Sequence, residues 1–192
     1  DYDSGQNKAP WVDEASAITN VVIGDGVTHI GEHAFEGCEK VIGINIPSSV
    51  KSIGACAFAA CISLTKITIP AGVTRIGNSA FIGCESLEKI DLPSSVKSIE
   101  DGAFALCTSL EELTIPDGVE VIEEGILSGC SGLKTLTIHA GVTAMNVYTL
   151  QCCSGLTEVN YSGTKEQWKA LSADMDNEYR DRIVIHCSDG DI

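Results

Sequence analysis

The chain matches itself when it is shifted by 23 residues, and this period constrains its fold more than any other feature. The period is clearest for two residue types, phenylalanine and cysteine. They recur in steps of 23 at Phe35, Phe58, Phe81 and Phe104, and at Cys38, Cys61, Cys84, Cys107, Cys130 and Cys153. A fixed period of about 20 to 50 residues is typical of repeat proteins, in which each unit buries its apolar face against its neighbours. The sequence therefore predicts a solenoid.

Each repeat contains one short predicted strand. Two apolar columns lie two residues apart, as at Ile67 and Ile69, and β-branched residues dominate both columns. A spacing of two indicates a strand with one buried face. In four repeats a proline such as Pro70 follows; it has no N–H to donate, so the strand should end there. Seven such strands, one per coil, would stack as a parallel sheet.

The remainder of each coil shows no strand pattern. After the turn, apolar pairs such as Val73 and Ile76 are three residues apart, which suits a short extended or 3₁₀ passage rather than a regular strand. Residues 80–84 place apolar groups at i, i+1 and i+4, so one or two helical turns would point them inward. Phe81 and its equivalents should then form a stacked aromatic column.

The period divides the chain into three predicted parts: a lead-in over residues 1–17, the solenoid over 18–161 and a C-terminal cap over 162–192. The lead-in has no period. In it, Trp11 either covers the first coil or anchors a loose tail, and the sequence leaves both alternatives open.

The predicted cap begins with a helix signal. Thr164 and Gln167 have the spacing of a capping box, so a helix of about eight residues should follow. Its apolar face, which includes Trp168, would cover the open end of the last coil. Residues 183–186 are predicted to add one more strand. Solenoids need such caps because a bare end coil exposes both core and backbone.

The repeat has the pattern L-x-x-I-x-I-P-x-x-V-x-x-I-G-x-x-A-F-x-x-C. The third coil fills every position of it, with Leu64, Ile67, Ile69, Pro70, Val73, Ile76, Gly77, Ala80, Phe81 and Cys84. This pattern resembles the BspA-like, or treponemal-type, leucine-rich repeat. The resemblance implies a right-handed α/β solenoid of seven coils, each of about 23 residues, with a parallel β-sheet on its concave side. It also implies a non-catalytic bacterial cell-surface or secreted protein that recognises host or microbial macromolecules in adhesion.

Charge and composition exclude several classes of partner. The formal net charge is −15 and the isoelectric point is near 4.4, which argues against nucleic acid and anionic membranes. No apolar run approaches the ~20 residues of a membrane helix, so membrane insertion is not expected. The chain starts at Asp1 without a leader, and the sequence does not show whether one was removed. We expect a monomer.

The nine cysteines are predicted to be mostly buried free thiols. Six of them lie on the repeat, where stacked coils hold their Cβ atoms parallel, and that direction opposes disulfide formation. Cys56, Cys152 and Cys187 lie off the repeat, and a bridge between the last two is an open alternative.

Two short motifs resemble metal sites. His29, Glu32 and His33 match H-x-x-E-H, which needs both histidines on one helix face. The repeat register instead places them across a turn at positions that vary between coils. Residues 174–178 begin like a calcium loop, but Tyr179 replaces the required glycine, which favours a solvated acidic loop. The sequence therefore predicts no enzyme, metal or cofactor.

The remaining candidate is the stripe of outward strand positions along the predicted concave side. The candidate binding residues on it are Lys66, Thr68, Lys89, Asp91, Glu112, Thr114, Thr135 and Thr137. The stripe has neither an aromatic residue nor an arginine, the usual interface anchors. Two interpretations remain: the stripe binds a protein or glycoprotein, or the module is a structural spacer without a ligand.

A second surface candidate is acidic. Six carboxylates crowd one coil, at Glu111, Glu112, Asp117, Glu120, Glu123 and Glu124. They could steer a basic partner, or they could form a solvated face with no partner.

Overall fold

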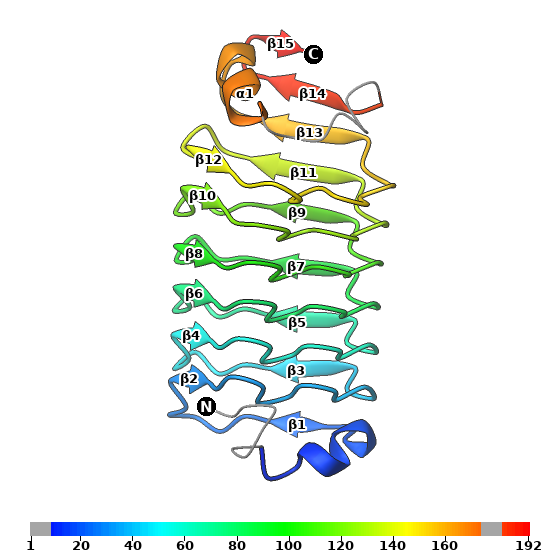
Figure 1. Cartoon of the computed structure of the whole chain (residues 1–192). Helices are drawn as coiled ribbons and strands as arrows, with labels where there is room; N and C mark the ends of the chain where they lie inside the picture. Colours follow the sequence, from blue (N-terminus) through cyan, green and yellow to red (C-terminus); the bar gives the residue numbers. More distant parts are fainter. Residues whose placement is uncertain (1–8, 174–181) are drawn as a thin grey trace.

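Successive coils of the chain stack into an elongated β-solenoid of about seven turns (Figure 1). The computed structural model describes residues 9–173 and 182–192. Each coil crosses the molecule twice, once in a main sheet and once in a second, narrower ladder. The predicted solenoid fold, with its helix-and-strand cap at the C-terminal end, is confirmed.

The main sheet has nine strands in the order β1-β3-β5-β7-β9-β11-β13-β14-β15. Its neighbours are parallel, except that the last pair is antiparallel. The register follows the repeat, so Ile67 pairs with Ile44 on one side and with Ile90 on the other. The strands are β1 (Val21–Val22), β3 (Gly43–Asn45), β5 (Lys66–Thr68), β7 (Lys89–Asp91), β9 (Glu112–Thr114), β11 (Thr135–Ile138), β13 (Glu158–Tyr161), β14 (Val184–Cys187) and β15 (Gly190–Asp191).

The passage after each turn is short and extended, as one of the two predicted alternatives states. It also pairs between coils as a second parallel ladder, so the expectation that it would form no regular strand was wrong. Its two-residue strands are too short to give a period-two pattern in the sequence. They pair because stacking brings the same extended backbone of successive coils into register. The strands are β2 (His29–Ile30), β4 (Ser52–Ile53), β6 (Arg75–Ile76) and β8 (Ser98–Ile99) in one sheet, and β10 (Val121–Ile122) and β12 (Ala144–Met145) in another.

The second ladder is interrupted between β8 and β10. Elsewhere in it, equivalent residues donate a backbone N–H to the preceding coil, as Lys97 does to the Thr74 carbonyl at 2.9 Å. Within the described part of the chain, the N–H groups of Glu120 and Glu123 have no such acceptor. A hollow of about 220 Å³ lies there, lined in part by Lys97 and Glu120. At this coil interface the second ladder therefore lacks two backbone hydrogen bonds that the equivalent positions of other coils form.

The segment before each cysteine forms a series of turns, and the predicted helical turns are wrong. Backbone N–H groups alternate in direction: Ala80 donates to Gly77 of its own coil at 3.2 Å, whereas Phe81 donates to Ala103 of the next coil at 2.8 Å. A helix would use every N–H within its own segment and leave the neighbouring coil unpaired. Hydrogen bonding between coils therefore decides the local backbone.

This alternation requires two residues of each coil to adopt the left-handed conformation, with φ between 51° and 77°. Glycine adopts it freely, whereas other residues are strained there by about 1 kcal/mol or more. Seven of the twelve residues at these positions are not glycine, so stacking outweighs the strain. The two columns are His33, Cys56, Ser79, Gly102, Gly125 and Tyr148, and Gly37, Ala60, Gly83, Leu106, Gly129 and Cys152.

The aromatic column is present as predicted. The rings of Phe58 and Phe81 lie 5.2 Å apart at an interplanar angle of 14°, and the steps to Phe35 and Phe104 are 5.5 Å. The three inner rings, from Phe58 to Phe104, are fully buried. The core around them is built from layers of equivalent apolar residues, one layer per coil.

The N-terminal end of this column is covered by Trp11, which decides between the two alternatives for that residue. Its ring stacks on Phe35 at 5.9 Å, and its Nε1–H donates to the Ala34 carbonyl at 2.8 Å. A 3₁₀ helix, η1 (Val12–Ala17), follows and leads into the first coil.

All nine cysteines are free thiols, and the six on the repeat are buried. From Cys61 onward, the Sγ–H group of each repeat cysteine donates to the preceding coil: Cys84 donates to the Phe58 carbonyl at 3.2 Å, and Cys107 to the Phe81 carbonyl at 3.3 Å. The alternative bridge between Cys152 and Cys187 is not formed. The repeat cysteines thus form a ladder of small core residues.

The C-terminal cap is built as the sequence predicts. Helix α1 (Lys165–Leu171) starts at a complete capping box, in which Thr164 Oγ1 accepts from the Gln167 N–H at 3.3 Å and Gln167 Oε1 accepts from the Thr164 N–H at 2.8 Å. Trp168 is buried against Tyr161, with ring centroids 5.4 Å apart. The additional antiparallel strand β15, which the sequence did not predict, lies outside β14.

We expect Trp168→Ala to open this end of the solenoid. Removing a buried aromatic ring should lower the free energy of unfolding by about 3–5 kcal/mol, because no neighbouring coil can refill the space. Thr164→Ala, which removes only the cap hydrogen bond, should cost about 1 kcal/mol. Hydrogen exchange in β14, compared with β5, measures the effect. Equal exchange of the two strands in Trp168→Ala would contradict it.

Candidate functional site

The candidate surface is the outward side of the main sheet, here called the outer face. Side chains alternate along each strand, so Ile67 points into the core while Lys66 and Thr68 are exposed. The strand register aligns these positions across coils, as in the pairing of Lys66 with Lys89. All eight predicted binding residues lie on this face, two each on β5, β7, β9 and β11.

At the centre of the outer face, the charged side chains form ion pairs with one another. Lys89 Nζ lies 3.0 Å from Glu112 Oε1 and 3.4 Å from Asp91 Oδ1. The hydrogen bond to Glu112, together with the charge of Asp91, raises the pKa of the Lys89 ammonium. Such exposed pairs add little stability, but they neutralise charge that a partner could otherwise use. Three of the predicted binding residues are therefore occupied with one another.

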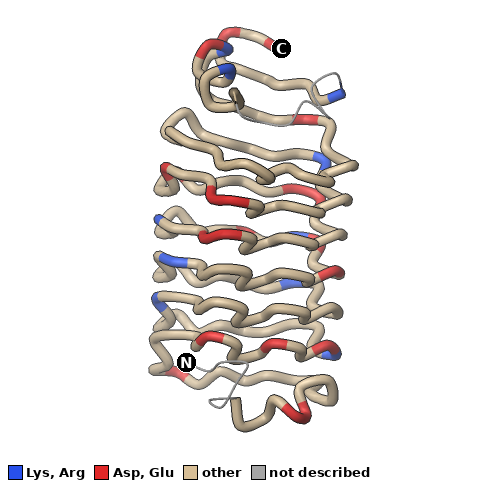
Figure 2. Tube along the Cα trace, in the orientation of Figure 1, with Lys and Arg blue, Asp and Glu red and all other residues tan. Residues whose placement is uncertain are grey.

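The acidic residues of the fifth coil do not form one patch. Glu111 and Glu112 lie at β9 and pair with Lys134 and Lys89, at 2.7 and 3.0 Å. Glu123 lies beyond β10 in the second ladder, where Asn146 Nδ2 donates to it at 2.9 Å. Figure 2 shows acidic positions on different sides of the coil. The period places these carboxylates in one coil, but the winding of the coil separates them.

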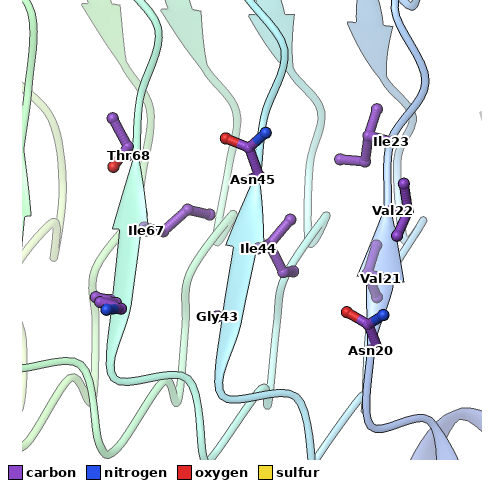
Figure 3. Close-up of a pocket in the computed structure, with 10 residues that line it drawn as sticks. Asn20, Val21, Val22, Ile23, Gly43, Ile44, Asn45, Ile67 and Thr68 are labelled. Atoms are coloured by element: carbon purple, nitrogen blue, oxygen red, sulfur yellow. The ribbon is translucent and has the colours of Figure 1, made fainter.

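A groove of about 580 Å³ lies on the N-terminal part of the outer face, across β1, β3 and β5 (Figure 3). The candidate residues Lys66 and Thr68 form one side of this N-terminal groove. The other lining residues were not among the predicted binding residues. The sequence does contain one signal for the groove, because Gly43 stands in a column whose other outward residues are larger. These other lining residues are Asn20, Val21, Val22, Ile23, Gly43, Ile44, Asn45 and Ile67.

A second groove of about 440 Å³ lies at the other end of the sheet, across β9, β11, β13 and β14. Thr114 and Thr137, from the predicted binding residues, and Asp117, from the acidic coil, line this C-terminal groove. The two histidines of its lining were not among the predicted surface residues. His186 Nδ1 lies 2.9 Å from Asp191 Oδ1. His139, at a position where four other coils have proline, is held by its Nε2 at 3.0 Å from the Val119 carbonyl oxygen.

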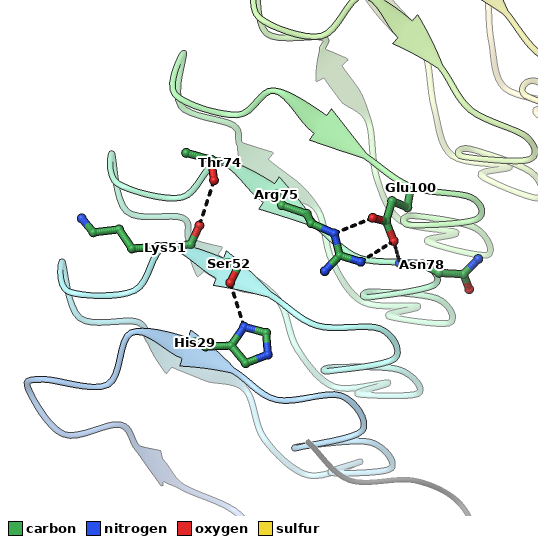
Figure 4. A network of polar contacts seen from close by, with 7 residues as sticks. All are labelled: His29, Lys51, Ser52, Thr74, Arg75, Asn78 and Glu100. Carbon is green, nitrogen blue, oxygen red and sulfur yellow. Dashed lines mark hydrogen bonds and ion pairs between the residues drawn. The ribbon is translucent and has the colours of Figure 1, made fainter.

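The H-x-x-E-H residues do not converge on a common site. His29 Nδ1 lies 2.7 Å from Ser52 Oγ on the second ladder (Figure 4), whereas His33 Nδ1 lies 2.6 Å from Glu36 Oε2. Among the described residues, no group of three or more His, Cys, Asp or Glu side chains could hold a metal ion. The calcium-loop pattern at 174–178 lies outside the described residues.

The same ladder holds a bidentate ion pair that links neighbouring coils (Figure 4). Arg75 Nη2 donates to Glu100 Oε2 at 2.9 Å, and the Asn78 N–H donates to the same oxygen at 3.0 Å. Arg75 is thereby engaged in holding two coils together rather than presented to a partner.

The helices of the described residues do not reach the combination of length and apolar character that a membrane span requires. The outer face combines the aligned polar side chains with two grooves, so it is the candidate binding surface.

Comparison with known proteins identifies the repeat. The family model described as BspA type leucine-rich repeat region matches in six copies, over residues 13–105 and 74–171. No curated protein matches the chain.

Solved structures agree with this result. A leucine-rich repeat protein of T. pallidum is 32% identical with a TM-score of 0.68, and the match covers 74% of this chain and 67% of that one. A leucine-rich repeat protein of Bacteroides ovatus is also 32% identical, with a TM-score of 0.56 and coverage of 76% and 47%.

The pneumococcal vaccine antigen PcpA is 22% identical, with a TM-score of 0.59 and coverage of 79% and 41%, and shares the fold. The chain thus spans less than half of the B. ovatus and PcpA chains that it matches. On the family match and its recurrence along the solenoid, the chain belongs to the BspA-type leucine-rich repeat family.

Proposed function

We propose that the chain is a non-catalytic binding module whose outer face contacts a protein or glycoprotein. The observation that supports this is the in-register array of exposed polar side chains on a continuous sheet, flanked by two grooves. Strand pairing fixes their spacing at about 4.8 Å, so a partner would meet a surface that is already ordered. Little conformational entropy is then lost on binding.

We place this module outside a bacterial cell, at the surface or in secreted form. Membership of the BspA-type family supports this location, because the resemblance to that family implies bacterial surface proteins that act in adhesion. The strongly acidic composition, with a net charge of −15, fits a partner that is neither nucleic acid nor an anionic membrane.

A structural spacer is the rival function, and the ion-paired centre of the outer face favours it. Lys89, Asp91 and Glu112 satisfy one another, and the aligned outward positions of the main-sheet strands β1 to β13 carry neither an aromatic residue nor an arginine. A spacer would need only the stacked core, with no partner for either groove.

The two functions differ in a direct binding measurement. The full chain is tested by biolayer interferometry against purified extracellular-matrix proteins and mucin-type glycoproteins. Lys66→Glu and Thr137→Glu should each weaken a genuine outer-face complex by about tenfold or more, because each buries a new charge in the interface. Ser52→Glu, on the second ladder, is the matched control and should bind like the wild type.

Lys89→Glu is unsuitable for this test, because it would place a third carboxylate beside Asp91 and Glu112. A partner that binds the wild type and both outer-face variants equally would exclude the outer face. If the wild type binds no protein of the panel, the spacer function is supported instead.

A further inference from the structure

We propose that the N-terminal groove is the recognition site within the outer face, and that it binds an extended acidic peptide segment of the partner. This proposal rests on the proposed binding function and gives it a location and a ligand class.

The groove exists because Gly43 has no side chain. Outward residues of adjacent strands stand in register, and Gly43 of β3 lies between Asn20, just before β1, and Lys66 of β5. A Cβ atom built on Gly43 would meet only the Lys66 carbonyl oxygen, at 3.8 Å, which is an ordinary contact. The space above Gly43 is therefore open (Figure 3), and a peptide backbone can approach the sheet there.

The charge of the groove favours a carboxylate. Lys66 has no ion-pair partner among the described residues, whereas its register neighbour Lys89 is paired with two carboxylates. Lys66 thus carries a positive charge that no carboxylate of the described residues compensates, in a chain whose net charge is −15. An aspartate or glutamate of a partner would complete this site as Glu112 completes that of Lys89.

The other side chains suit a peptide backbone. Asn20 and Asn45 are exposed, and each amide offers both a donor and an acceptor, as peptide groups require. Thr68 adds a hydroxyl group on the β5 side of the groove. Val22 is 85% exposed, an unusual exposure for a β-branched apolar residue, and can cover an apolar side chain of the same peptide segment.

The C-terminal groove lacks this complementarity. Its lining includes Asp117 and His186, and His186 already has the carboxylate of Asp191 as its partner. An acidic segment would meet like charge there, so the two grooves differ in the ligand that they favour.

The test uses selection with short random peptides displayed on phage. The immobilised full chain and its Gly43→Val variant are panned in parallel, and enriched peptides are synthesised and measured by fluorescence anisotropy. Gly43→Val adds a side chain to the groove, its Cβ meets the backbone only at an ordinary contact distance, and its melting temperature shows whether the fold is retained. Lys66→Gln removes the charge alone, and Lys134→Gln, outside the groove, is the matched control.

We expect the wild type to enrich peptides with an acidic residue beside an apolar one. Their affinity should fall roughly tenfold or more in Gly43→Val and about two- to fivefold in Lys66→Gln, and should decrease with added salt. Lys134→Gln should change nothing.

Three outcomes overturn the proposal: enriched peptides without acids, affinity unchanged in folded Gly43→Val, or no enrichment. If affinity depends instead on Thr137 or Asn160, which line the C-terminal groove, the outer face still binds and only the location is wrong. If a protein partner is found but neither groove affects its binding, the outer-face function fails as well.

Discussion

Raising the pH above 9 should destabilise this solenoid steeply, because its core contains six buried thiols. Burial raises the pKa of Cys84, Cys130 and Cys153 from the ordinary 9.0 to about 12, and raises that of the other three as well. Above pH 9 the unfolded chain therefore releases protons that the folded chain retains. The free energy of unfolding then falls as the pH rises, whereas below pH 9 both states keep these protons.

The expected slope is large because the thiols act together. Each buried thiol contributes about 1.4 kcal/mol per pH unit between its unfolded and folded pKa, so six contribute several kcal/mol per unit. Urea unfolding under reducing conditions, at pH values on both sides of 9, measures this slope. Cys84→Ala should reduce it by about one thiol's contribution.

Cys152→Ala is the matched control, since Cys152 is already exposed in the folded chain. Its slope should equal that of the wild type. A Cys84→Ala variant with an unchanged slope would show that the alkaline instability comes from other groups, such as the lysine ion pairs.

Phe81→Ala should be among the most damaging single substitutions in the chain. Phe81 is fully buried, and its ring lies 5.2 Å from that of Phe58 and 5.5 Å from that of Phe104. Its removal leaves a cavity between two rings that are themselves fixed by their coils, so relaxation is limited. We expect the free energy of unfolding to fall by about 3–5 kcal/mol.

Phe81→Leu is the control, because leucine occupies the same column at Leu127 and Leu150. It should cost about 1 kcal/mol, since most of the volume remains. Urea unfolding followed by circular dichroism gives both values. Equal losses for the two variants would mean that the aromatic column is not a stacked core.

The sequence predicted which residues are buried, because the same residue types recur at the same positions of every coil. The apolar columns, the aromatic column and the capping box at Thr164 and Gln167 were all correctly predicted, since each is recorded in residue type and spacing. The second ladder and the turns of residues 77–84 were not. Their backbone conformation depends on N–H groups such as that of Phe81, which bond to the next coil.

The candidate site shows the same division. The sequence placed Lys66, Lys89 and Glu112 on one face, and the structure agrees. The sequence could not show that Lys89 is ion-paired whereas Lys66 has no carboxylate partner in the described part of the chain, or that Gly43 opens a groove. These facts depend on which side chains of adjacent coils reach one another.

The sequence by itself determined the period, the family and the residues that point inward, because burying the same face in every coil demands the same residue types every 23 positions. The tertiary structure alone decided where backbone hydrogen bonds run between coils, where the second ladder breaks, and which surface charges stay free. Those features arise from contacts between equivalent positions of neighbouring coils, and a single repeat does not contain them.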